Sequence, residues 1–179
     1  MSRERLLQQL AAHVPLTEEE AEMRARLAEF VWAYENCFER SLLVGHVTGS
    51  AWIVDLDRTH VLLTHHRKLD KWLQLGGHAD GDSDVLRVAM REACEESGLA
   101  SLRPVRESIL DVDIHLIPAR KTEPEHFHYD VRYALEADRG EALRMSDESH
   151  DLRWVRVDEV ARLTQEESVL RMVRKMGLL

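Results

Sequence analysis

Cysteine is scarce in this sequence, which contains only Cys37 and Cys94. Two thiols so far apart do not have the spacing of a cysteine-ligated metal site, and they cannot build a disulfide framework. We therefore expect two reduced thiols in a cytoplasmic protein.

Long apolar runs are also absent, so we expect no transmembrane helix and no membrane partner. The first residues, Met1 to Arg5, lead into a glutamine-containing segment without an apolar stretch, which is unlike a signal peptide. Internal repeats and low-complexity tracts are missing as well. The 179 residues suit one globular domain with an extension.

Positive charge is in short supply, because 24 Lys and Arg face 33 Asp and Glu, for a formal net charge of −9. General nucleic-acid binding depends on basic residues that neutralise phosphates, so this balance argues against it. The protein could still bind small phosphorylated substrates if divalent cations supply the missing positive charge.

Hydrophobic periodicity predicts a mixture of helices and strands without regular βαβ alternation. Helices are expected over residues 3–12, 17–39, 84–97, 158–163 and 166–176, and strands over 42–53, 61–65, 72–75, 107–117, 126–135 and 152–155. This order predicts the α/β class, with a sandwich around a mixed sheet. Residues 1–40 would form an N-terminal helical extension, and residues 41–179 the catalytic domain. The extension could also support a homodimer.

Three glutamates mark the predicted helix over 84–97. Glu92, Glu95 and Glu96 stand at positions i, i+3 and i+4, so they share one helix face. Their mutual repulsion destabilises a bare helix, and a hard divalent cation with oxygen ligands would offset it. A solvated acidic face explains three surface glutamates equally well, because surface glutamate is common.

The surrounding residues add a specific pattern. The stretch from Gly77 to Leu99 resembles the Nudix box, which consists of Gly, five residues, Glu, seven residues, Arg-Glu-apolar, one residue, Glu-Glu, one residue and Gly-apolar. The matching positions are Gly77, Arg91, Glu92, Ala93, Glu95, Glu96, Gly98 and Leu99. The resemblance implies an α/β/α sandwich. It also implies Mg²⁺ or Mn²⁺ held by the three glutamates, and hydrolysis of a nucleoside diphosphate linked to another group.

One position departs from the box. Ser83 stands where the family has its first glutamate, which supports the loop–helix geometry in part by pairing with the arginine that is Arg91 here. Asp80, Asp82 or Asp84 could substitute for that glutamate, or Ser83 could be the N-cap of the helix. The departure therefore concerns catalytic efficiency more than metal binding.

The resemblance also suggests catalytic roles for individual residues. Glu95 and Glu96 would be the main metal ligands, and Glu92 a ligand or the base that orients water. Arg91 would brace the site. Glu148 precedes the predicted strand over 152–155, where some Nudix enzymes place an extra metal ligand or general base, although it could equally be a plain loop acid.

Polar residues alternate along two predicted strands joined by residues 118–124. Period-two geometry puts each polar set on one face, and the short connection makes the strands antiparallel neighbours whose polar faces coincide. The first set is Asp111, Asp113 and His115, and the second is His126, His128, Asp130 and Arg132.

Three interpretations of this polar face are open. It could be a water-facing surface, which antiparallel sheets tolerate, although Asp and His are uncommon choices for a plain exposed strand. It could be a substrate pocket, with Arg120 or Lys121 reaching phosphate. It could hold a second metal at His126 and His128, because histidine is a common ligand. We favour the pocket and predict substrate contacts from its histidines and aspartates.

Other residues could join this pocket. His46 lies on the predicted strand over 42–53, although a lone strand histidine is usually structural. Gly77 ends the next strand, and His78 could contact phosphate or merely cap the loop. We expect Trp52, Trp72 and Trp154 to pack in the core.

Two alternatives to hydrolysis are weighed. The Nudix-fold isomerase of isopentenyl diphosphate is similar in length and uses histidines, but it expects a cysteine where this chain has Gly76 before Gly77 and His78. A non-catalytic Nudix-like binding domain is supported only by Ser83. The substrate itself is not identified by the sequence, because loops and strands outside the box set specificity.

Overall fold

The computed structural model describes residues 3–119 and 124–179 of the chain. Its helices are α1 (Arg3–Ala12), α2 (Glu18–Ala33), α3 (Val85–Ser97), α4 (Val160–Leu163) and α5 (Glu167–Arg174), with 3-10 turns η1 (Val157–Glu159) and η2 (Lys175–Leu178). Its strands are β1 (Gly45–Asp55), β2 (His60–His66), β3 (Lys71–Leu73), β4 (Leu75–His78), β5 (Arg103–Pro104), β6 (Asp111–Ile117), β7 (His126–Ala137) and β8 (Ser149–Arg156).

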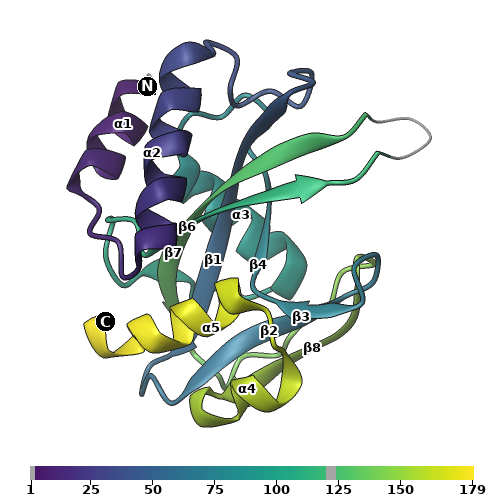
Figure 1. Cartoon of the computed structure of the whole chain (residues 1–179). Coiled ribbons are helices and arrows are strands. Elements are labelled where there is room, and N and C mark those ends of the chain that lie inside the picture. Colours follow the sequence, from purple (N-terminus) through teal and green to yellow (C-terminus); the bar gives the residue numbers. More distant parts are fainter. Residues whose placement is uncertain (1–2, 120–123) are drawn as a thin grey trace.

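Two long strands form the centre of one mixed sheet. β1 and β7 run parallel along their whole length, and every other strand pair is antiparallel. β1 pairs first with β4 and then with β2, while β7 pairs first with β6 and then with β5. Each central strand therefore changes its outer neighbour along its length. The β6–β7 hairpin diverges from the β2–β3–β8 strands (Figure 1).

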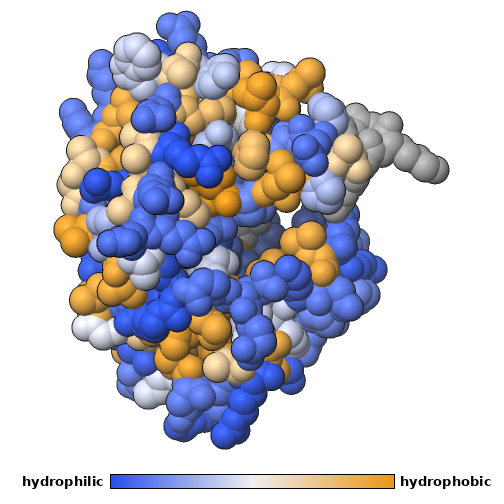
Figure 2. Space-filling model, in the orientation of Figure 1, coloured by the Kyte–Doolittle hydropathy of each residue, from blue (hydrophilic) through white to orange (hydrophobic). Residues whose placement is uncertain are grey.

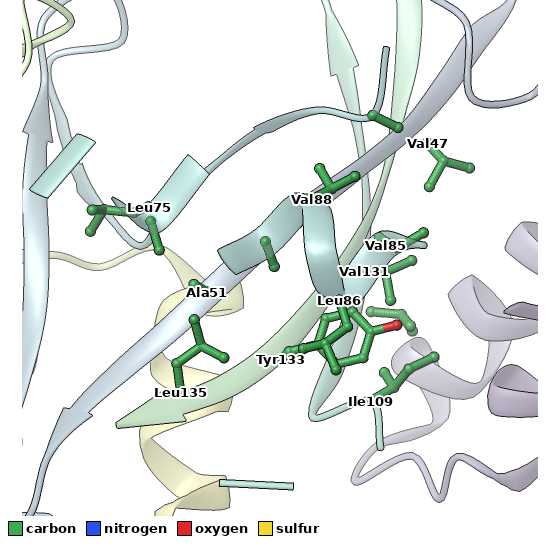
Figure 3. Close-up of a cluster of buried hydrophobic side chains, with 14 of the residues drawn as sticks. Val47, Ala51, Leu75, Val85, Leu86, Val88, Ile109, Val131, Tyr133 and Leu135 are labelled. Atoms are coloured by element: carbon green, nitrogen blue, oxygen red, sulfur yellow. The ribbon is translucent and has the colours of Figure 1, made fainter. Parts of the chain in front are cut away.

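One face of the sheet packs against α3. Val47 and Ala51 of β1 are fully buried there with Val88 and Ala89 of the helix (Figure 3). Each buried side chain of valine size contributes about 1.5–3 kcal/mol. This core fixes α3, and with it the three glutamates, relative to the central strands.

The opposite face divides into an apolar and a polar half. Trp52 and Val54 alternate with the residues that face α3, and they pack against Val169 and Met172 of α5. Helices thus cover both faces of a mixed sheet, which confirms the predicted α/β sandwich. Of the three tryptophans expected in the core, only Trp52 is fully buried, whereas Trp72 and Trp154 are partly exposed.

The N-terminal helices are present as predicted, but α2 is shorter than expected. Thr17 caps it by accepting a hydrogen bond from the backbone N–H of Glu20. The helix ends at Ala33 instead of residue 39, because Tyr34 adopts extended backbone and the following turns bring Cys37 into the core. Similarly, the strand expected from residue 107 begins at Asp111.

Both N-terminal helices contribute to the main hydrophobic core through Leu6, Leu10 and Leu27. The boundary between an N-terminal extension ending at residue 40 and a catalytic domain starting at residue 41 stays a prediction, and so does the homodimer. Within the described ranges, no helix combines the length and apolar character that crossing a membrane requires.

Candidate active site

The helix that carries the glutamates is held at both ends. Its N-cap is Asp84, which accepts a hydrogen bond from the backbone N–H of Arg87 at 3.3 Å. The suggestion that Ser83 is the N-cap is therefore wrong by one residue. At the other end Gly98 is the C-cap and takes φ 71° and ψ 8°, a left-handed conformation that favours glycine.

Two of the glutamates lie against the glycine pair of β4. A Cβ added at Gly77 would stand 2.4 Å from Oε2 of Glu92, so any larger residue would displace this carboxylate. The backbone N–H of Gly76 donates a hydrogen bond to Glu96. The glycine pair of β4 and two of the box glutamates therefore form one structural unit.

The carboxylates are crowded and partly buried. Burial, together with the negative charges of Glu92, Glu148 and Glu95, raises the pKa of Glu96 to about 8. The pKa of Glu92 is also raised, first by burial, although Arg91 opposes the shift. Glu148, which sequence reasoning placed near the site on resemblance alone, thus lies close enough to act electrostatically on Glu96.

Arg91 links the helix to β4. Its Nη1 lies 2.7 Å from Oε1 of Glu92 and 3.6 Å from Oε2 of Glu95, and its Nη2 donates to the carbonyl of His78 at 2.9 Å. These contacts fit the predicted bracing role. Glu95 is the most exposed of the three glutamates, with 61% of its side chain accessible, whereas only 15% of the Glu92 side chain is.

The three aspartates near Ser83 have arginine partners of their own. Asp80 forms a bidentate pair with Arg40, Asp82 pairs with Arg87, and Asp84 pairs with Arg5 at 2.9 Å. Hydrogen bonds from Arg40 and Arg87 lower the pKa of Asp80 and Asp82, and the charge of Arg91 adds a smaller effect to both. Replacement of the missing box glutamate by one of these aspartates stays a prediction.

These carboxylates suit the metal that the box implies. Mg²⁺ and Mn²⁺ prefer oxygen ligands, and Glu92, Glu95, Glu96 and Glu148 offer carboxylate oxygens. The raised pKa values of Glu92 and Glu96 indicate that negative charge there lacks full compensation. A divalent cation would supply that compensation, so the residues present fit a hard metal ion.

The predicted hairpin is present with the expected register. β6 pairs antiparallel with β7, so that Asp113 stands opposite Asp130 and His115 opposite His128. The two polar sets therefore share one face, the face opposite α3. Arg120, which was predicted to reach phosphate, lies outside the described residues.

The inner half of this polar face is a buried ionic network. Arg132 is fully buried and contacts Asp130, Asp111 and Asp113 at 2.8, 3.3 and 3.3 Å. Arg171 of α5 bonds Asp111 through two nitrogens at 2.8 Å each. These partners satisfy the aspartates internally and tie α5 to the sheet, which gives Asp130 and Asp113 a bracing role. Their contact with substrate stays a prediction.

The outer half of the face gathers histidines. The His46 ring centroid lies 5.0 Å from that of His78, 4.8 Å from that of His128 and 5.0 Å from that of His126. His46 and His126 are buried, whereas His115 is exposed. The surface is hollowed between the β6–β7 hairpin and the β2–β3 strands (Figure 2). Among the described residues, the predicted pocket residues thus share one face, apart from Gly77, which faces the helix.

Sequence reasoning missed two charged residues of this face. Arg171 and Lys175 are buried, and Lys175 contacts Asp111 at 2.7 Å as well as Glu20 of α2. Both belong to the C-terminal segment, where a basic helix end is ordinarily solvated. Only the long-range packing of α5 and η2 on β6 identifies them.

Known proteins share both the sequence pattern and the fold. The family model described as NUDIX domain matches residues 46–176. A NUDIX family hydrolase from Clostridium perfringens is 28% identical, with a TM-score of 0.56 over 74% of this chain and 97% of that chain. The Ap4A hydrolase of C. elegans is 16% identical, with a TM-score of 0.59 over 74% and 95% of the two chains. The dihydroneopterin triphosphate pyrophosphohydrolase of E. coli is 18% identical, with a TM-score of 0.53 over 72% and 92%. Curated proteins yield no match.

Proposed function

Because the chain belongs to the NUDIX domain family and is a Nudix-type pyrophosphohydrolase, we propose that it uses Mg²⁺ or Mn²⁺ to cleave a diphosphate linkage in a small nucleoside-diphosphate-type substrate. The observation that carries this proposal is the convergence of Glu92 and Glu96 on Gly76 and Gly77, with the charge of Glu148 close by. Partly buried carboxylates that lie close together repel one another, and a divalent cation bound between them would offset this repulsion.

The ionised carboxylates would hold the metal between the helix and β4. Glu96 and Glu92 would be the inner ligands, because both are partly buried against the glycine pair, and Glu95 would complete the set from its more exposed position. When bound, the ion supplies Lewis-acid stabilisation of phosphate oxygens and lowers the pKa of a bound water.

The chemical step would be attack of a water oxygen on phosphorus. As that P–O bond forms, the anhydride P–O bond on the other side of phosphorus breaks, and the leaving phosphate takes the electron pair. Glu148 would accept the proton of the water, a role supported by its charge acting on Glu96 from outside α3. Arg91 would keep Glu92 and β4 in register while this happens.

The polar face offers a place for the rest of the substrate. His115 and His128 of the β6–β7 hairpin and His78 of β4 share this face, and polar side chains suit a nucleoside or sugar. The Ap4A hydrolase and the dihydroneopterin triphosphate pyrophosphohydrolase have such low sequence identity to this chain that only their fold is informative. Both compounds therefore belong in a substrate panel without preference.

The test is a panel of nucleoside triphosphates, nucleotide sugars, dinucleoside polyphosphates, dihydroneopterin triphosphate and isopentenyl diphosphate, each with Mg²⁺ or Mn²⁺. We expect hydrolysis of at least one nucleoside-type compound. Isomerisation of isopentenyl diphosphate without hydrolysis would favour the isomerase, and tight ligand binding without any turnover would favour a binding domain. Either result would refute the proposal.

A further inference from the structure

Three histidines from three different strands bring their ring nitrogens together. His46 of β1, His78 of β4 and His128 of β7 each offer one nitrogen, and these atoms lie within 4.8 Å of one another. We propose that His46, His78 and His128 form a second metal site, which binds a transition-metal ion of the Zn²⁺ class. This site is additional to the carboxylate site of the proposed hydrolysis and differs from it in ligand chemistry.

The sheet itself builds this cluster. His46 and His128 are register neighbours on the parallel strands β1 and β7, and His78 pairs β1 at Thr48, two residues from His46. Residues two apart on a strand share a face, so all three side chains emerge on the same side. Gly77 precedes His78 and faces Glu92 on the other side. The histidines therefore lie across β4 from the carboxylates.

His46 has unmet bonding capacity. Its side chain is 3% exposed, and within the described residues neither Nδ1 nor Nε2 has a hydrogen-bond partner. A buried polar group without a partner carries an uncompensated desolvation penalty, so native structures rarely keep one without a reason. Coordination of a cation by one ring nitrogen would use the lone pair that the protein leaves unpaired.

His128 has a partner that orients its ring. Nδ1 of His126 donates to the carbonyl of Pro124 at 2.9 Å, so a neutral His126 presents Nε2 as an acceptor, 3.3 Å from Nε2 of His128. Metal-ligating histidines are commonly held by a hydrogen bond of this kind. Burial and neighbouring histidines also lower the pKa of His46 to about 4 and that of His128 to about 2, which keeps both rings in the neutral form that ligates metals.

The ligand type selects the class of metal. Imidazole nitrogen suits Zn²⁺, Co²⁺, Ni²⁺ and Cu²⁺, whereas Mg²⁺ prefers oxygen. In a tetrahedral zinc site with Zn–N distances of about 2.1 Å, ligand nitrogens stand about 3.4 Å apart. The nitrogens of the three histidines, which lie up to 4.8 Å apart, would reach this distance by small rotations of the side chains. Three protein ligands would leave a fourth position for water or a substrate oxygen, as in catalytic zinc sites.

Equilibrium dialysis of the metal-stripped full chain against Zn²⁺, without substrate, tests this proposal. We expect about one equivalent of zinc to bind, and at least a tenfold loss of affinity in His46→Gln and in His128→Gln. His150→Gln, on an exposed histidine of β8, and Glu96→Gln, at the carboxylate site, should both bind zinc as the wild type does. Circular dichroism of each variant checks that it is folded.

X-ray absorption at the zinc edge of the wild-type complex gives a result that needs no variant. The proposal predicts three imidazole ligands around the bound ion. Coordination by oxygen alone, loss of binding in Glu96→Gln instead of the histidine variants, or no stoichiometric binding would each overturn it. Because no substrate is used, these outcomes are independent of whether the chain hydrolyses a diphosphate.

Discussion

Gly77 and the carboxylate of Glu92 lie so close together that a Cβ added to the glycine would stand 2.4 Å from Glu92 Oε2. Gly77 is not among the glycines with positive φ, so its backbone conformation is open to other residues. The requirement at this position is space. A strand glycine thus allows α3 to bring a carboxylate against β4, which explains in physical terms why the box begins with glycine.

Gly77→Ala should therefore damage activity more than stability. The added methyl group displaces the end of a flexible glutamate, so we expect kcat to fall about tenfold or more while the melting temperature changes by only a few degrees. Gly177→Ala is the matched control, because a Cβ there meets nothing within 4 Å. Equal activity of the two variants would show that the Gly77–Glu92 contact has no catalytic importance.

Arg91→Lys tests the bracing role of the box arginine. Lysine keeps the charge but lacks the planar fork that contacts Glu92 and donates to the carbonyl of His78. We expect kcat/KM to fall about 10- to 100-fold, as for loss of an outer-shell partner of a metal ligand. Arg87→Lys, one turn earlier on the same helix and paired with Asp82, should stay close to wild type. A similar loss in both variants would point to a general effect of helix charge.

The sequence was most informative where structure depends on local spacing. Hydrophobic periodicity predicted a helix over residues 84–97, where α3 lies, and strand alternation predicted the shared polar face of β6 and β7. The N-cap shifted from Ser83 to Asp84, because two adjacent residues can both cap and only the geometry decides between them.

Features that join distant segments were harder to predict. The sequence suggested that His46 and His78 could join the pocket of His128, but alternation does not encode the strand order, with β1 between β4 and β7, that brings them together. The buried pairing of Glu20 with Lys175 links residues at opposite ends of the chain, and neither residue differs locally from a surface charge. Local patterns specify elements and faces, whereas the partners of buried charges depend on the whole topology.

Glu20→Gln probes that long-range pairing through pH. Burial raises the pKa of Glu20, but hydrogen bonds from His13 and Lys175 outweigh it and lower the pKa from 4.5 to about 2. A carboxylate whose pKa is lowered in the folded state stabilises the protein fully at pH values above its unfolded-state pKa. This stabilisation is lost as the pH falls through the folded-state pKa. We expect the variant to lose about 2–3 kcal/mol of unfolding free energy at neutral pH.

Urea denaturation of wild type and Glu20→Gln across the acid range measures this effect. The difference in unfolding free energy should be constant above about pH 5 and shrink as pH falls from 4.5 toward 2. Glu29→Gln, on the exposed face of α2, should show no such pH-dependent difference. A difference that stays constant down to pH 2 would contradict the assigned ion pair.

Asp130→Asn separates bracing from substrate contact. The Asp130 carboxylate accepts hydrogen bonds from Thr48, Ser50 and Arg132 at 2.8–2.9 Å, and Arg132 is fully buried. Loss of its charge should destabilise the fold by about 3 kcal/mol, measured by chemical denaturation. Asp57→Asn, in an exposed turn, should have little effect. A stable variant whose KM alone is raised would assign Asp130 to substrate binding instead.

We propose that the carboxylates on α3, which lie against the glycines of β4, hydrolyse a diphosphate with a divalent metal. The most direct measurement is kcat of wild type and Glu96→Gln on the best substrate of the panel, with Mg²⁺ and with the metal chelated, and with Glu29→Gln as a control. The account predicts that kcat falls at least about a thousandfold in Glu96→Gln and on chelation, and stays unchanged in Glu29→Gln. A Glu96→Gln variant within a few-fold of wild type, or full activity without divalent metal, would contradict it.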